Sequence, residues 1–181
     1  MQTHIRFRHK DLVEKSKSGD RSSQYQLYML YVDAMYNIGM RMLGAKEDAE
    51  DIVQDSFVEA FKNLEGFKYE STFGAWLKRI VINRCINHLK IKRIPLAPLD
   101  VHEFHLTENE SDHEHCDRVE IIKVKRAIEK LPAGYKQIIN LYLIEGYDHN
   151  EIGQILEIST STSKSQYHRA KRKLIDIIDT I

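Results

Sequence analysis

The chain has 181 residues, 42% of them hydrophobic and 30% charged, which suffices for one large or two small domains with real cores. It contains no run of about 18 apolar residues, and residues 1–18 lack the apolar stretch of a secretory signal, so the sequence predicts neither membrane insertion nor export. We therefore expect a cytoplasmic protein whose two cysteines, Cys85 and Cys116, are reduced thiols.

The net charge of zero conceals an uneven distribution of charge along the chain. Residues 1–95 hold 16 basic and 12 acidic side chains, net +4, and residues 118–181 hold 11 and eight, net +3. Between them, residues 96–117 hold seven acidic side chains and no Lys or Arg. Two mildly basic blocks flanking an acidic segment indicate that the blocks, rather than the whole chain, bind a polyanion.

The first block is predicted to be helical throughout. Apolar residues recur at three- and four-residue steps over 27–42, 49–61 and 73–89. Gly44 separates the first two segments, and the stretch 63–71 reads as a loop. The second helix carries an acidic face opposite its apolar one. Trp76 has apolar neighbours on its own helix face, which favours packing in the core.

Residues 95–117 are predicted to form a flexible acidic linker. Pro95 and Pro98 end the preceding helical pattern because proline has no N–H and disfavours helix in the residue before it. No helical or alternating period follows them. Histidines and a cysteine in this segment are zinc-ligand types, but their spacing matches no standard site, so we expect no metal and no cofactor. These residues are His102, His105, His113, His115 and Cys116.

The second block, 118–181, is predicted to be helical and to end in a helix-turn-helix. A short helix over 150–156 is followed by the turn 157–159 and a longer helix over 160–177. Ser159 is expected to cap the longer helix, since its hydroxyl can accept a hydrogen bond from a free backbone N–H.

One face of this last helix combines hydrogen-bonding groups with positive charge. Such a helix suits the DNA major groove, with its early residues near base edges and its later cations near phosphates. The candidate DNA-binding residues are Ser161, Thr162, Lys164, Ser165, His168, Arg169 and Arg172.

These residues resemble a known family. The strings LPAGYKQIINLYLIEGYDHNEIGQIL and ISTSTSKSQYHRAKRKL, over 131–156 and 158–174, resemble region 4 of sigma-70-type factors of the extracytoplasmic function (ECF) group. DAEDIVQDSFVEAFKNLEGFKYESTFGAWLKRIVIN, over 48–83, resembles region 2 of the same group. Two motif sets in the expected order, with a linker of suitable length, are more specific than either alone.

The resemblance implies an all-α fold of two small helical domains joined by the flexible linker. Residues 1–94 would form the region 2 domain, 95–117 the linker and 118–181 the region 4 domain. The implied partners are core RNA polymerase, promoter DNA and an anti-sigma factor. The implied role is that of an alternative sigma factor, which directs promoter recognition and initiation and is not an enzyme.

The resemblance also assigns roles to residues of the first block. The acidic second helix would face the clamp helices of the polymerase through Asp48, Glu50, Asp51, Gln54 and Asp55. The minus-10 element would be recognised and opened by the 63–71 loop and the following helix, where a flipped base needs stacking and edge hydrogen bonds. The candidates are Phe67, Lys68, Tyr69, Arg79 and Asn83. The minus-35 element would be read by the helix over 160–177.

The sequence departs from the family at a few positions. Ser161 stands where glycine is frequent, Ser163 where an apolar residue is frequent, and Tyr167 where an aliphatic is commoner. The main alternative is a helix-turn-helix regulator without a polymerase-docking role, which would leave the acidic helix and the 63–71 loop unexplained. An enzyme is disfavoured because the sequence offers no nucleophile–base pair, phosphate loop or HExxH motif.

Overall fold

The computed structural model describes residues 9–92 and 118–180, and within these ranges it contains helices and turns but no strand. The chain divides into two compact units, residues 1–92 and 93–181. The prediction of an all-α fold with two small helical domains is confirmed. The expected linker with its histidines falls on residues outside those described. Among the described residues, no helix is long and apolar enough to span a membrane.

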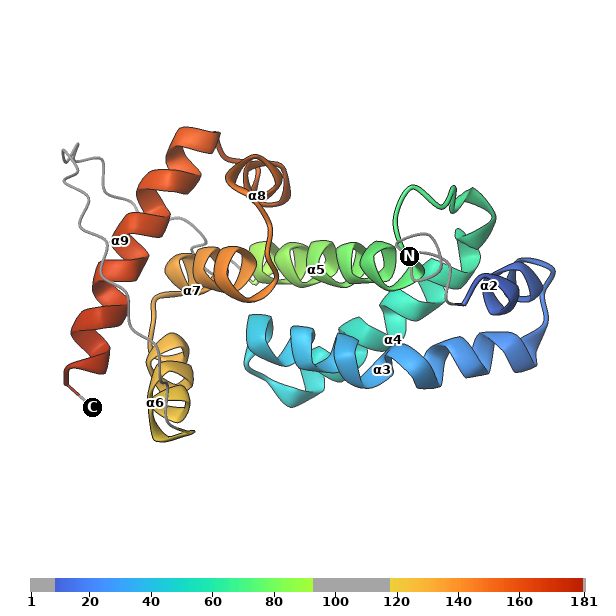
Figure 1. The fold of residues 1–181 in the computed structure, drawn as a ribbon, viewed down its shortest axis with the longest axis horizontal. Helices are drawn as coiled ribbons and strands as arrows, with labels where there is room; N and C mark the ends of the chain where they lie inside the picture. The colour runs from blue at the N-terminus through green and yellow to red at the C-terminus, as the bar shows by residue number, and fades with distance from the viewer. Residues whose placement is uncertain (1–8, 93–117, 181) are drawn as a thin grey trace, which may run out of the picture. The chain divides into compact units, whose positions relative to one another are not determined.

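The first unit is a bundle built around one long helix (Figure 1). This helix, α3 (Arg21–Leu43), packs against α2 (Lys10–Lys17), α4 (Lys46–Lys62) and α5 (Phe73–Ile91), and α4 also packs against α5. A single 3₁₀ turn, η1 (Leu64–Gly66), follows α4.

Local sequence signals fix the ends of these helices. The Asp20 carboxylate accepts a hydrogen bond from the backbone N–H of Ser23 at 3.0 Å and starts α3. Gly44 ends α3 with φ of 75°, a left-handed conformation that glycine adopts without a steric penalty. The Thr72 hydroxyl accepts from the N–H of Ala75 at 3.1 Å and starts α5. Capping side chains therefore fix where α3 and α5 begin, and Gly44 fixes where α3 ends.

Burial of the predicted apolar faces forms the core of this unit. A Cβ added at Gly39 would lie 3.3 Å from that of Ala49, so α3 and α4 cross at close range there. The core residues include Leu27, Met35, Ile38, Ala49, Val53, Phe57, Leu77, Val81, Ile82, Cys85 and Ile86.

Helix α2 lies in the block that was predicted to be helical throughout, but the sequence did not mark it out as a separate helix. Its eight residues include only two apolar side chains, Leu12 and Val13, so no helical period was recognisable. Val13 is nevertheless buried against the bundle, and Gly19, at φ of 87°, turns the chain from α2 into α3. Tertiary packing supplies the stabilisation that this short segment lacks by itself.

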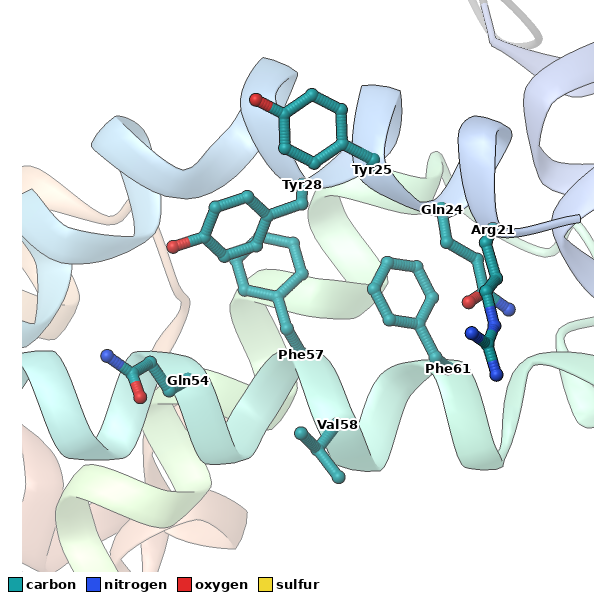
Figure 2. Close-up of a pocket in the computed structure, with 8 residues that line it drawn as sticks. All are labelled: Arg21, Gln24, Tyr25, Tyr28, Gln54, Phe57, Val58 and Phe61. Carbon is teal, nitrogen blue, oxygen red and sulfur yellow. The ribbon is translucent and has the colours of Figure 1, made fainter.

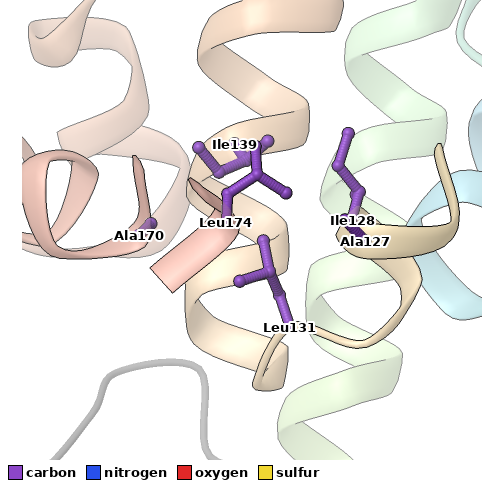
Figure 3. Packing of buried hydrophobic residues seen from close by; sticks show 6 residues of the cluster. All are labelled: Ala127, Ile128, Leu131, Ile139, Ala170 and Leu174. Atoms are coloured by element: carbon purple, nitrogen blue, oxygen red, sulfur yellow. The ribbon is translucent and has the colours of Figure 1, made fainter. Parts of the chain in front are cut away.

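The second unit contains α6 (Arg118–Glu129), α7 (Ala133–Ile139), a π-helical turn η2 (Asn140–Ile144), α8 (His149–Leu156) and α9 (Thr160–Ile178). Apolar side chains from α6, α7 and α9, together with Leu131, meet in one cluster (Figure 3). Its buried members are Ala127, Ile128, Leu131, Ile139, Ala170 and Leu174.

Helices α8 and α9 form the predicted helix-turn-helix. Asp148 and Glu151 form a reciprocal capping box at the start of α8. Glu157 ends α8 in a left-handed conformation with φ of 58°. The Ser159 hydroxyl accepts from the N–H of Thr162 at 3.0 Å and starts α9, which is the predicted cap. The turn between the two helices thus occupies residues 157–159, as predicted.

Gly153 makes this turn possible, and replacing it should be destabilising. A Cβ at position 153 would lie 2.8 Å from the backbone oxygen of Ile158. Because backbone cannot rotate away as a side chain does, we expect Gly153→Ala to lower the free energy of unfolding by about 1 kcal/mol, despite alanine's better helix propensity. Urea unfolding of the full chain, followed by far-UV circular dichroism, measures the change. An unfolding midpoint at or above that of the unchanged protein would contradict the expectation.

Candidate functional site

Two acidic side chains of α4 form ion pairs with residues at or next to α5. Asp48 contacts two cationic-type side chains at the end of α5. Its Oδ2 lies 2.7 Å from the Nζ of Lys92, which follows the helix, and its Oδ1 lies 3.4 Å from the Nε2 of His88. The hydrogen bond from Lys92 lowers the pKa of the Asp48 carboxyl. Asp55 lies 3.0 Å from the Arg84 guanidinium, also on α5. These two candidates for polymerase binding therefore already have ion-pair partners within the unit.

The other face of α4 lines an open groove of about 370 Å³ between α3 and α4 (Figure 2). Gln54, another of the candidates, lies on its edge, and Val58 follows one turn later with half of its surface exposed. Opposite them, Tyr25 of α3 is 64% exposed. The remaining lining residues are Arg21, Gln24, Tyr28, Phe57 and Phe61.

Sequence reasoning missed this groove. The sequence pattern divides α4 into an apolar and an acidic face. It does not indicate that Val58 and Phe61 are partly exposed and form an apolar surface. Val58 follows Gln54 by four residues and Phe61 follows Phe57 by four. This spacing places each pair on one side of the helix, and it is the sequence signal that indicates the surface. Of the remaining candidates on α4, Asp51 is exposed and Glu50 lies 3.6 Å from the Lys46 Nζ.

The 63–71 loop is held by an aromatic cluster at the start of α5. The ring of Phe67 is 4% exposed and lies 5.2 Å from the ring of Trp76 and 4.7 Å from that of Tyr69, between centroids. Trp76 also packs against Phe73, at 5.9 Å, but it is half-buried and not part of the core. Phe67 thus supports the loop from inside.

The other minus-10 candidates lie nearer the surface of the first unit. Lys68 and Asn83 are exposed, and Arg79 is half-buried on α5, one turn before Asn83. Tyr69 is half-buried and has φ of 60°, which is rare for a residue other than glycine. A direct contact between DNA and any of these side chains, or that of Phe67, stays a prediction.

The candidate DNA-reading residues lie along α9, mostly at its surface. Ser161, Lys164, Ser165 and Arg172 are exposed, while Thr162, His168 and Arg169 are half-buried. The hydroxyls of the first turn also serve the helix cap, because the Ser159 Oγ lies 2.9 Å from the Ser161 Oγ and 2.7 Å from the Thr162 Oγ1. Five cations precede the first carboxylate of α9 in the sequence: Lys164, Arg169, Lys171, Arg172 and Lys173.

A polar and aromatic cluster joins α8 to α9. Ser163 is fully buried, and its Oγ lies 2.9 Å from the Nδ1 of His149. The His149 ring stacks on Tyr142 at 4.6 Å between centroids, and Tyr142 contacts Tyr167 at 4.4 Å. The two positions where the sequence departs from the commoner apolar pattern, Ser163 and Tyr167, therefore pack together with a histidine that sequence reasoning did not single out.

This cluster should make the helix-turn-helix sensitive to acid. Burial lowers the pKa of His149, and the charges of Lys164 and His168 lower it further against the opposing effect of Asp148. Since the folded state then binds the proton more weakly than the unfolded state, stability is fully present above the unfolded value of about 6.5 and is lost as the pH falls below it.

We expect His149→Gln to reduce this dependence, because glutamine can hydrogen-bond to Ser163 but does not titrate. Thermal unfolding of the full chain at several pH values between about 5 and 8 measures this pH dependence of stability. His9→Gln, which replaces a histidine of the other unit, serves as the control. An equal loss of melting temperature with acid in the unchanged protein and in His149→Gln would contradict the assignment.

Two family descriptions match the chain, one in each unit. Sigma-70 region 2 matches residues 27–93, and Sigma-70, region 4 matches residues 121–174. The order and positions of the two matches agree with the resemblance seen in the sequence strings.

Characterised relatives align along nearly the whole chain. The ECF RNA polymerase sigma factor SigW of Bacillus subtilis is 31% identical over 91% of this chain and 94% of its own length. The ECF RNA polymerase sigma-E factor of Haemophilus influenzae is 29% identical over 90% of this chain and 91% of its own.

Solved structures share the fold. CnrH, solved in complex with the cytosolic domain of CnrY, has a TM-score of 0.57 and 24% identity over 93% of this chain and 96% of its own. The sigma factor RpoE of Bartonella quintana, solved with the anti-sigma factor NepR, has a TM-score of 0.57 and 22% identity over 86% of this chain and 96% of its own.

Proposed function

Because the chain belongs to the extracytoplasmic function group of sigma-70 family sigma factors, we propose how its two units divide the work of initiation. The region 2 unit docks on core RNA polymerase and recognises and opens the minus-10 element. The region 4 unit reads the minus-35 element. The proposed boundaries are 1–94 and 118–181, with 95–117 as the linker between them. The observation that carries this division is the match of one family region to each compact unit.

The docking surface in this proposal is the groove face of α4. Its apolar and aromatic side chains, Tyr25 and Val58 among them, can supply the desolvated centre that a protein interface needs. Asp51 and Gln54 add polar contacts beside it. Asp48 and Asp55 already form ion pairs within the unit, and in this proposal they contribute mainly by orienting α5. A further exposed ion pair with the polymerase would add little to the binding free energy.

The DNA surfaces follow from exposure and charge. Helix α9 presents Lys164 and Ser165 early, where base edges are reached, and cations later, where phosphates lie. In the region 2 unit, Lys68 and Asn83 face solvent and can contact the opened strand. The protein acts with the polymerase in the cytoplasm, performs no covalent chemistry of its own, and is held inactive by an anti-sigma factor until needed.

Run-off transcription with core polymerase on a library of genomic promoters tests the proposal. We expect transcripts only when the protein is added, and their start sites should share two upstream elements. A protein that directs no transcript from any template, yet binds DNA by itself, would instead be a helix-turn-helix regulator. Capture of core polymerase by the full chain separates the two readings independently of promoter choice.

A further inference from the structure

Helix α2 contacts the 63–71 loop through the side chain of Tyr69 and the backbone of Phe67. The phenolic O–H of Tyr69 donates a hydrogen bond to the Glu14 carboxylate, 55 positions earlier in the sequence. Lys17 lies 4.8 Å from the centre of the Tyr69 ring, and its Nζ is 3.2 Å from a Glu14 oxygen. The Nζ of Lys10 lies 5.7 Å from the same ring. One aromatic side chain of the loop is thus surrounded by charged groups of α2.

Lys17 also binds the loop backbone. Its Nζ donates to the carbonyl oxygen of Phe67 at 3.2 Å, and its side chain is only 20% exposed. A single ammonium group therefore connects the Glu14 carboxylate, the Tyr69 ring and the loop backbone. Charge-assisted hydrogen bonds and a cation over an aromatic ring each stabilise such an arrangement.

The backbone of Tyr69 needs this support. Its φ of 60° places a bulky residue in the left-handed region, where the Cβ of an L-residue is sterically strained. A strained conformation persists only where its surroundings hold it. The contacts from α2 and the buried ring of Phe67 are the surroundings that the structure provides.

We propose that α2 is a brace that positions the minus-10 loop, with Glu14 and Lys17 as positioning residues acting through Tyr69. This inference rests on the proposed function of the loop and deepens it. Tyr69 anchors the loop, so that the exposed Lys68 is presented to the opened strand in one conformation. Preorganisation of this kind lowers the entropy that must be lost when a base is captured.

The first test measures the brace without any DNA. Trp76 is the single tryptophan of the chain and lies 5.2 Å from Phe67, so its quenching by acrylamide reports on the loop. Trypsin cleavage after the exposed Lys68 reports on it independently. Tyr69→Phe removes only the hydroxyl, and Glu14→Gln removes only the charge. We expect both variants to be cleaved at Lys68 about fivefold faster than the unchanged protein, and their Trp76 fluorescence to be quenched more strongly. This is the size of effect expected when one charge-assisted hydrogen bond is lost.

The second test measures strand opening with the full chain and core polymerase. The template is a promoter from the run-off screen, used both as a duplex and with its minus-10 segment already unpaired by mismatches. We expect Tyr69→Phe and Glu14→Gln to slow opening of the duplex about fivefold and to transcribe the preopened template at nearly the unchanged rate. Tyr36→Phe and Lys15→Gln are the matched controls, one on α3 and one on α2, and should behave like the unchanged protein.

The outcomes separate the brace from the function. Unchanged cleavage and quenching in Tyr69→Phe and Glu14→Gln would overturn the brace. So would equal losses on duplex and preopened templates, which would indicate general damage. If the unchanged protein opens no promoter, the proposed function fails, while the cleavage test still decides whether α2 holds the loop.

Discussion

Val58→Glu should weaken binding of the protein to core RNA polymerase by at least about thirtyfold, the effect of removing one interface hot spot. Val58 lies on the groove face of α4 beside Gln54 and Phe57, with 51% of its surface exposed. A carboxylate at the centre of an apolar interface would lose its hydration when the polymerase covers it, and no opposite charge would compensate. This desolvation cost would weaken binding. Fluorescence titration of labelled protein with core polymerase measures the dissociation constant.

The matched control is Ile91→Glu, the same chemical change at a side chain that is 81% exposed at the end of α5. It should leave polymerase affinity within about threefold, and both variants should melt as the unchanged protein does, because neither side chain is in the core. Equal affinities of Val58→Glu and the unchanged protein would remove the groove from the docking surface.

The two faces of α4 also predict an order of effects. Gln54→Ala should weaken polymerase binding more than Asp48→Asn, since Gln54 lines the groove whereas Asp48 is occupied by Lys92. The reverse order would place the docking surface on the α5 side of the helix. Sequence alone could not rank these residues, because it gave all five candidates the same polar character.

Periodicity and capping signals predicted most of the fold correctly. The break at Gly44, the turn at 157–159 and the cap at Ser159 are set by local chemistry, which the sequence displays directly. The bounds of helix α2 could not be predicted, because its position is set by burial of Val13 and by polar contacts to a loop fifty residues away. Such contacts leave no pattern in a single sequence.

The candidate sites were predictable to a similar extent. Residue type and spacing indicated a candidate DNA-reading face on α9, which stays a prediction. They did not show that Phe67 is buried beneath its loop or that Ser163 pairs with His149, because both depend on which side chain lies opposite in space. The departures at Ser163 and Tyr167 were visible in the sequence, but their common cause, packing around the His149 ring, required the structure.

The second large effect is expected on α9, where Lys164→Ala should weaken promoter binding by the assembled polymerase about tenfold and relax preference at one base pair of the minus-35 element. Lys164 is exposed in the second turn of the helix, close to the capped end that would enter the major groove. Each base-edge contact is worth about 1–3 kcal/mol of discrimination, which corresponds to this loss.

Lys173→Ala provides the contrast, because Lys173 lies about two and a half turns further along α9 and is also exposed. A cation at that position should neutralise a phosphate, so its loss should lower affinity uniformly across sequences and reduce the slope of log affinity against log salt by about 1. Anisotropy titrations of promoter duplexes with single base-pair changes, between about 50 and 200 mM salt, distinguish the two effects. If Lys164→Ala leaves both affinity and base preference unchanged, the early turns of α9 do not read the promoter, and the assignment of that helix to the minus-35 element must be abandoned.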